Sequence, residues 1–270
     1  MRLVGLIAAC WISTMAAGMA SPACAPVPGL AQALSRPYLQ FLLLGEVHGT
    51  REGPQLFFDV VCNAARSGRP VAVALEDSVD EQGSLDRFMT SRGDAAAREA
   101  FLNPEFWGDP LQDGRTSAAY FELHLALRAM LARGAILSVT AVQPGENDNG
   151  DYEQTMAAHI QAIGTRHPRA LVIALLGNFH AAKARMSFNA GVMPAGSYLH
   201  AASVVSLTIA DFGGTAWTCA SATDCAAHRI GPSTDKSRGA ILQALPDGGY
   251  DGMISTGMAA TASPPALPQR

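Results

Sequence analysis

Short, continuous runs of apolar residues alternate with amphipathic stretches along most of this chain. Six of the runs have the length of buried strands: 38–44, 71–75, 136–142, 170–176, 203–209 and 252–255. Between them, apolar residues recur at helical spacing, which predicts helices over 52–66, 81–102, 118–133 and 152–166. The first of these has Pro54 in its first turn and ends before Gly68, as helix boundaries often do.

This alternation of strands and helices is typical of βαβ units. Continuous apolar strands are covered on both faces, so we predict an α/β fold, with a mainly parallel sheet and helices on both faces. Ligands of such sheets bind beyond the carboxyl ends of the strands. We expect one domain over 37–258, a loose Pro- and Ala-rich leader over 21–36 and a disordered tail over 259–270.

Residues 1–20 have the features of a secretory signal peptide. Arg2 is followed by an uncharged, mostly apolar stretch that ends at Gly18-Met19-Ala20, where small residues suit a cleavage site. The alternative is a membrane anchor, but the stretch is short of the roughly 20 apolar residues that a span usually needs. We expect a secreted or periplasmic protein with no stable membrane span after cleavage. Whether the protein is lipid-anchored stays open.

Composition excludes some classes of function and suggests disulfides. Charged residues make up 16% of the 270 residues, and the formal net charge is −4. Nucleic-acid binders usually carry a basic stripe, so we expect no nucleic-acid partner. Four cysteines follow the expected cleavage site, and an even number in an exported chain suggests disulfides. Cys219 and Cys225 enclose a short loop and are the better pair, whereas a bond between Cys24 and Cys62 stays open.

Acidic residues and histidines gather where three of the predicted strands end. Glu46 and His48 follow the first strand, Glu76 ends the second, and His180 follows the fourth. Because parallel strands share their carboxyl edge, we expect these four side chains to converge. Two carboxylates and two imidazoles can activate water without a metal. Alternatively, Glu46, His48 and His180 are a ligand set for Mn, Co or Zn.

Three further residues are candidates for substrate binding. Arg51 directly follows the polar segment after the first strand, and Asn178 lies in the segment Gly177-Asn178-Phe179-His180. Arg115 lies in the loop before the helix over 118–133, where it could bind an anionic group. An ordinary turn that leads into this helix is the alternative for the Arg115 segment.

The segment Gly45-Glu46-Val47-His48 resembles a motif of the superfamily that joins erythromycin esterases, ChaN-like haem-binding proteins and Tiki/TraB proteins. Its Gly-Glu-x-His spacing, and the later Gly-Asn-x-His spacing over 177–180, are closest to the ChaN-like proteins. The following Gly49-Thr50-Arg51-Glu52 is similar to the esterases instead. A helical motif of ChaN-like proteins, Arg-Asp-x-x-Met-Ala, has Tyr152-Glu153-Gln154-Thr155-Met156-Ala157 in its place here, without the arginine.

The resemblance implies an α/β fold with a catalytic site at Glu46, His48, Glu76 and His180. We therefore expect an exported hydrolase that cleaves an ester or peptide bond of a small-molecule or peptide substrate, with or without a bound metal. The ChaN-like proteins imply an alternative, which is a non-catalytic haem- or iron-binding envelope protein. Haem would need an open apolar face, and residues 101–107, Tyr120 and Phe121 are candidates for it.

Overall fold

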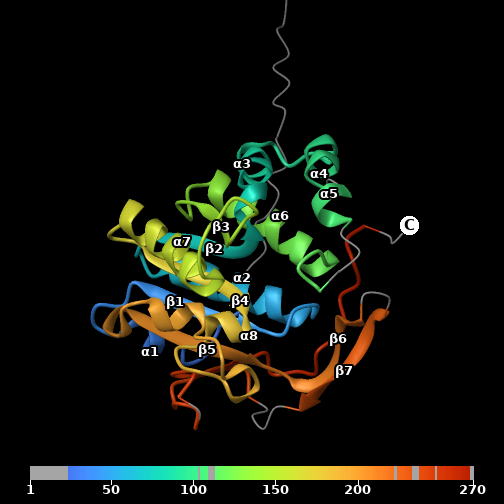
Figure 1. Ribbon diagram of the computed structural model, residues 1–270. Helices are drawn as coiled ribbons and strands as arrows, with labels where there is room; N and C mark the ends of the chain where they lie inside the picture. The colour runs from blue at the N-terminus through green and yellow to red at the C-terminus, as the bar shows by residue number, and fades with distance from the viewer. Residues whose placement is uncertain are drawn as a thin grey trace, which may run out of the picture.

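A seven-stranded sheet in the order β3-β2-β4-β1-β5-β9-β8 forms the centre of the protein (Figure 1). The computed structural model describes residues 24–102, 104–108, 113–221, 224–232, 237–246 and 248–267, so the expected signal peptide lies outside it. The strands are β1 (Phe41–Glu46), β2 (Val71–Ser78), β3 (Val139–Gln143), β4 (Leu171–Gly177), β5 (Val204–Ala210), β8 (Gly239–Ile241) and β9 (Gly252–Ser255). Only β8 runs antiparallel to its neighbour, which confirms the mainly parallel sheet.

Helices pack on both faces of this sheet, because successive side chains of a strand point to opposite faces. Leu42 and Leu44 of β1 belong to a core shared with α2, α3 and α6. Phe41 and Leu43 of the same strand belong to a second core shared with α7 and α8. The helices are α1 (Leu30–Leu34), α2 (Glu52–Arg66), α3 (Gln82–Thr90), α4 (Ala95–Phe101), α5 (Pro104–Trp107), α6 (Ala118–Ala132), α7 (Tyr152–Arg166) and α8 (Asn178–Ala181).

The single helix predicted over 81–102 is divided into α3 and α4 in the structure. Gly93, with a φ of 67°, follows the end of α3. The Asp94 side chain then caps α4 by accepting a hydrogen bond from the backbone N of Ala97 (3.0 Å). A glycine at positive φ followed by a capping aspartate ends one helix and begins another, and the apolar spacing did not reveal this break.

An antiparallel hairpin that the sequence pattern did not predict extends from the domain (Figure 1). Its strands are β6 (Phe212–Ser221) and β7 (Asp224–Pro232), and a disulfide joins Cys219 to Cys225 across them. This is the cysteine pair favoured by the sequence. Gly213, Gly214 and many alanines interrupt any alternation of apolar and polar residues, so the strands left no clear pattern.

The leader is held on the domain, whereas its composition predicts a loose segment. A disulfide bonds Cys24 to Cys62 of α2, which decides the pairing left open by the sequence. The short helix α1 buries Leu30 and Ala33. Over the described residues, none of the helices is both long enough and apolar enough to cross a membrane.

The described part of the tail, residues 259–267, is also packed rather than disordered. Ala262 forms a β-bridge with Thr50, and the backbone N of Ser263 donates to the carbonyl of Gly49 (2.8 Å). The Ser263 hydroxyl accepts from the backbone N of Ala119 in α6 (2.9 Å). These bonds use backbone groups and a small side chain, which is why the composition gave no sign of them. The tail thus supports the loop that carries His48.

Candidate active site

The four predicted acid and base residues meet because their strands are neighbours in the sheet. Strand β4 lies between β2 and β1, so the residues that follow these three strands share one edge. The register pairs Glu46 at the end of β1 with Gly177 at the end of β4. Glu76 reaches the same place from β2, because its carboxylate accepts a hydrogen bond from the backbone N of Gly177. His48 and His180 follow β1 and β4.

Glu76 is the centre of this cluster. Its Oε1 atom lies 3.6 Å from His48 Nε2, 3.7 Å from His180 Nε2 and 3.6 Å from Arg115 Nη1. The residue is only 3% exposed. Burial by itself would raise the pKa of Glu76, but the positive charges of His48, His180 and Arg115 outweigh it and lower the pKa to about 2. A buried carboxylate therefore faces three basic groups.

His48 lies between two carboxylates. Its Nδ1 donates to Oε1 of Glu46 (3.0 Å), while its Nε2 faces Glu76. Burial disfavours the charged ring, but the attraction of Glu76 and Glu46 is stronger and raises the pKa of His48 to about 10. The close approach needs a glycine at position 177, because a Cβ there would lie 3.0 Å from His48 Nε2.

The carboxyl group of Glu46 differs from that of Glu76. Burial raises the pKa of Glu46 above its usual value, and this effect outweighs the hydrogen bond with His48. Within the described part of the chain, its Oε2 atom is buried and has no hydrogen-bond partner. Of the two carboxyl groups, that of Glu46 therefore binds a proton more readily than that of Glu76.

Glu153 is a member of the cluster that the sequence analysis did not single out as a site residue. His180 Nδ1 donates to Glu153 Oε1 (2.8 Å), and Glu153 Oε2 accepts from the backbone N of Ala195 (2.9 Å). This hydrogen bond and the charge of Glu76 raise the pKa of His180, although burial acts in the opposite direction. Glu153 lies on the inward face of α7 together with Met156 and Ile160. An acidic residue on this apolar face is the signal in the sequence that could have identified Glu153 as a site residue.

Arg115 belongs to the cluster, and its guanidinium is well bonded. Asp113 accepts from its Nε (2.9 Å) and its Nη2 (2.6 Å), and the side chain of Gln143 accepts from its Nη1. The same Nη1 faces the carboxylate of Glu76. Arg115 therefore provides a fixed positive charge beside the two histidines.

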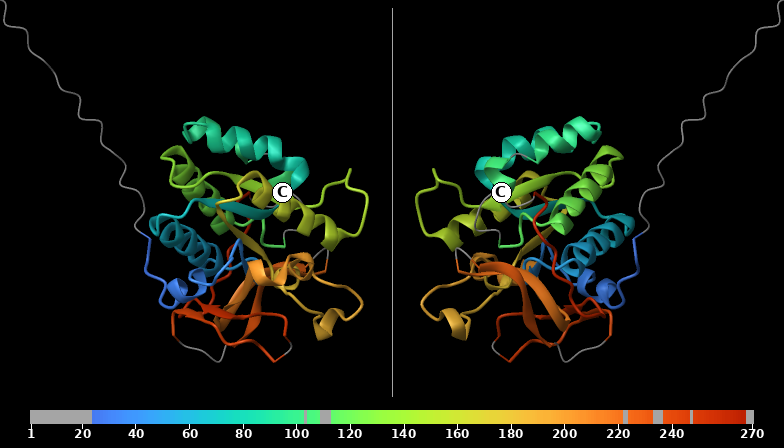
Figure 2. Two further views of the ribbon diagram at one scale, coloured as in Figure 1. Left: turned by 90° about the vertical axis from the view of Figure 1, so that its left-hand side faces the viewer. Right: turned by 90° about the vertical axis from the view of Figure 1, so that its right-hand side faces the viewer.

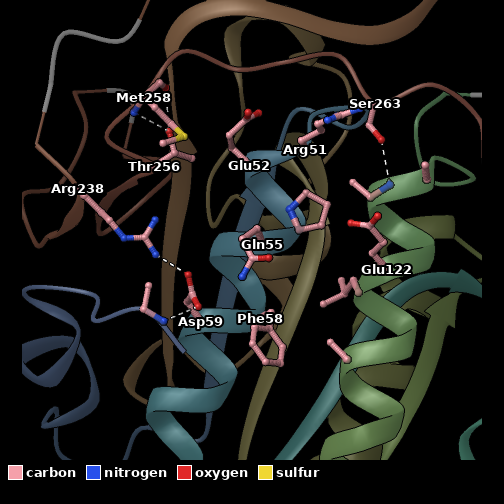
Figure 3. Close-up of a pocket in the computed structure, with 16 residues that line it drawn as sticks. Arg51, Glu52, Gln55, Phe58, Asp59, Glu122, Arg238, Thr256, Met258 and Ser263 are labelled. Atoms are coloured by element: carbon pink, nitrogen blue, oxygen red, sulfur yellow. Dashed lines mark hydrogen bonds and ion pairs between the residues drawn. The ribbon is translucent and has the colours of Figure 1, made fainter. Parts of the chain in front are cut away.

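Asn178 and Arg51, the other two predicted binding residues, have different surroundings. Asn178 Oδ1 accepts from the hydroxyl of Thr208 (2.9 Å), a bond that links α8 to β5. Arg51 lines a separate pocket of about 500 Å³ between α2, α6 and the tail (Figure 3). Figure 3 also shows Glu122 on α6 and Phe58 on α2 beside this pocket. None of the four Glu and His residues lines it.

The arrangement does not fit a metal ion. Among the residues that the structure describes, no group of three or more His, Cys, Asp or Glu side chains is placed to hold one. The ring nitrogens of His48 and His180 face carboxylates that favour the protonated rings, whereas a metal ligand must be a neutral imidazole. Glu46, His48 and His180, expected as alternative ligands, are not found as such a group among the described residues.

Three of the aromatic residues expected to form an apolar face for haem are buried in the described part of the chain. Phe101, Trp107 and Tyr120 are buried, with exposures of 7%, 1% and 1%. The ring of Phe101 stacks on Phe88 with a centroid distance of 4.3 Å, and Trp107 packs edge-on to Phe121. These aromatic residues fill the core between α3 and α6, so they offer no open surface to a porphyrin.

Comparisons with known proteins find solved structures with a similar fold. No family model and no curated protein matches the sequence. An open-conformation structure of a mutant of the erythromycin esterase EreC shares 11% identity over 84% of this chain and 92% of its own, with a TM-score of 0.63. A succinoglycan biosynthesis protein shares 11% identity over 73% of this chain and 72% of its own, with a TM-score of 0.57. A Bacillus cereus protein shares 11% identity over 85% of this chain and 91% of its own, with a TM-score of 0.56. The chain thus has the fold of the erythromycin esterase, which confirms the expected resemblance at the level of the fold.

Proposed function

We propose that this protein is an exported hydrolase that cleaves an ester bond with water activated by the Glu/His cluster. The observation that carries the proposal is the position of Glu76, whose Oε1 faces the Nε2 atoms of both His48 and His180. Four acid and base groups thus lie within one small volume, as general acid–base catalysis requires. The fold shared with an esterase and the two disulfides also support it.

In the proposed reaction His48 is the general base. Its Nε2 removes a proton from a water molecule, while the bond from Nδ1 to Glu46 fixes the orientation of the ring. The water oxygen forms a bond to the ester carbonyl carbon, and the carbonyl electrons move onto the oxygen. When the tetrahedral intermediate collapses, the C–O bond to the alcohol breaks, and the alcohol leaves with the proton from His48.

Two positive charges stabilise the oxyanion of this intermediate. Glu153 raises the pKa of His180 and so favours its imidazolium form, and Arg115 is held by Asp113. Fixed charges at a partly buried site stabilise developing charge more effectively than water does. Both side chains reach solvent, with exposures of 21% and 22%, so a substrate can contact them.

The test is a panel of nitrophenyl esters and short peptides assayed with the purified protein, with and without a chelator. We expect hydrolysis of esters that survives removal of divalent metals. Turnover that appears only after Mn, Co or Zn is added would contradict the proposed mechanism. The absence of any hydrolysis above the buffer rate would contradict the proposed function.

A further inference from the structure

Several exposed apolar side chains lie close in sequence to residues of the Glu/His cluster. Eight large hydrophobic residues are exposed in the described part of the chain. Four of them follow or precede residues of the cluster in the chain: Val47 after Glu46, Tyr152 before Glu153, and Phe188 and Val192 after His180, with exposures of 37%, 41%, 69% and 36%. We refer to these four as the apolar rim. Isolated exposed apolar residues are ordinary, but a concentration beside a site indicates a surface that binds something apolar.

The rim is connected to His180 through a series of aromatic contacts. The ring of Tyr152 lies 5.7 Å from the ring of His180, measured between centroids. The ring of Phe179 lies 5.6 Å from the ring of His180, and the ring of Phe188 lies 6.0 Å from that of Phe179. An apolar group that contacts Phe188 and Phe179 would therefore place its neighbouring atoms at His180.

Two loops next to the cluster extend from the same side of the molecule (Figure 2). The loop before α7 and the loop after α8 both extend from one side, seen on the right of the left-hand panel of Figure 2. Tyr152 is the first residue of α7, at the end of one of these loops, and Phe188 lies in the other. Both loops follow the carboxyl ends of strands, β3 and β4, which is where the cluster lies.

We infer that the apolar rim binds the acyl chain of the substrate, so that the preferred substrates are esters of medium-length alkyl acids. This inference rests on the proposed function and deepens it. Phe188 and Tyr152 are the residues that would contact the chain, while the carbonyl group lies beside His180. Water would then attack the carbonyl group of an ester whose acyl chain is bound to the rim.

The experiment compares nitrophenyl acetate, butanoate, hexanoate and octanoate. Full burial of a methylene group corresponds to a rate gain of up to about fourfold, so kcat/KM should rise by at least about tenfold from acetate to octanoate. Phe188→Ala should remove most of this gain and leave the rate with acetate nearly unchanged. Leu137→Ala is the matched control, because Leu137 is 46% exposed but lies before β3, at the opposite edge of the sheet. A flat dependence on chain length, or an equal loss in both variants, would overturn the inference.

A binding measurement separates this inference from the proposed function. Saturation-transfer NMR with 2-nonanone, a ketone that water does not cleave, reports contact with an alkyl chain even if no ester is hydrolysed. Binding that Phe188→Ala weakens and Leu137→Ala does not would support the rim as an alkyl site, whatever the outcome for hydrolysis. No binding of the ketone, or binding of haemin in its place with a Soret shift, would overturn it.

Discussion

The Nε2 atom of His48 lies 3.6 Å from Oε1 of Glu76, and this pair determines the charge state of the site. Together with Glu46, Glu76 raises the pKa of His48 to about 10, and His48, His180 and Arg115 together lower the pKa of Glu76 to about 2. Near neutral pH the resting protein therefore holds an imidazolium beside a carboxylate. Because the pKa of His48 lies well above 7, only a small fraction of the molecules has the neutral ring that can act as a base at neutral pH.

The first prediction concerns the pH dependence of catalysis. If neutral His48 is the base, kcat/KM should rise about tenfold per pH unit between about pH 6 and pH 8, because each unit increases the neutral fraction tenfold. Glu76→Gln removes the anion that favours the imidazolium, so the rise should move to lower pH. The measurement is the pH range over which kcat/KM rises in each protein, and not the absolute value of kcat/KM. A rate that falls over this range would mean that the charged ring is the active form.

The second prediction concerns Glu153, which acts through His180. Glu153→Gln keeps an acceptor for the backbone of Ala195 but removes the charge that raises the pKa of His180. We expect kcat to fall about ten- to a hundredfold, less than the roughly hundred- to thousandfold loss on removing an oxyanion donor itself, with little change in KM. The decline of activity at high pH should also begin at a lower pH than in the wild type, because His180 loses its proton sooner. Glu99→Gln, an exposed acid on α4, is the control. An unchanged profile would show that Glu153 has only a structural role.

Much of this site was predictable from the sequence, and Glu153 shows where the prediction ended. Glu46, His48, Glu76 and His180 each lie at or just beyond the end of an apolar run, and parallel strands present their carboxyl ends at one edge. Their adjacency required only that β4 pair with both β1 and β2. Glu153 comes from a helix on one face of the sheet, and nothing local in the sequence states that α7 brings it to His180.

The errors in the fold have a similar cause. The tail forms backbone hydrogen bonds with distant segments, and the two strands of the hairpin β6–β7 pair with each other through their backbones. Such bonds place few demands on side-chain type, so residues such as Ala262 and Gly214 give no periodic signal. The break before Asp94 was local, but it consists of one glycine and one cap inside an otherwise helical stretch.

The third prediction concerns Gly49, which supports the His48 loop. Its φ is 80°, and a Cβ would lie 2.0 Å from the carbonyl oxygen of Trp217. Gly68 is a matched control, because its φ is 86° and nothing lies within 4 Å of a Cβ there. Gly68→Ala should lower the free energy of unfolding by about 1 kcal/mol through backbone strain alone. Gly49→Ala should cost at least about 2 kcal/mol more, as overpacking adds to strain. If urea denaturation gives the same loss of unfolding free energy for Gly49→Ala and Gly68→Ala, the loop at Gly49 moves away from Trp217 without cost.

The fourth prediction compares the two disulfides. Cys24 and Cys62 are 38 residues apart, whereas Cys219 and Cys225 are 6 apart. A longer closed loop removes more entropy from the unfolded chain, which gives about 4 kcal/mol for the first bond and about 2 kcal/mol for the second. Replacing each pair with serines and measuring urea denaturation tests the order. A larger loss of unfolding free energy for the Cys219–Cys225 pair would show that native contacts, and not loop length, determine how much each disulfide stabilises the protein.

The most direct measurement is the rate of ester hydrolysis by the wild type, His48→Asn and His180→Asn under identical conditions. His200→Asn is the control, because this histidine is exposed and lies outside the cluster. We predict measurable turnover by the wild type and the control, with losses of at least about a hundredfold in the other two variants. Equal rates in all four folded proteins, or no turnover by the wild type on any ester, would contradict a hydrolase that acts through this cluster.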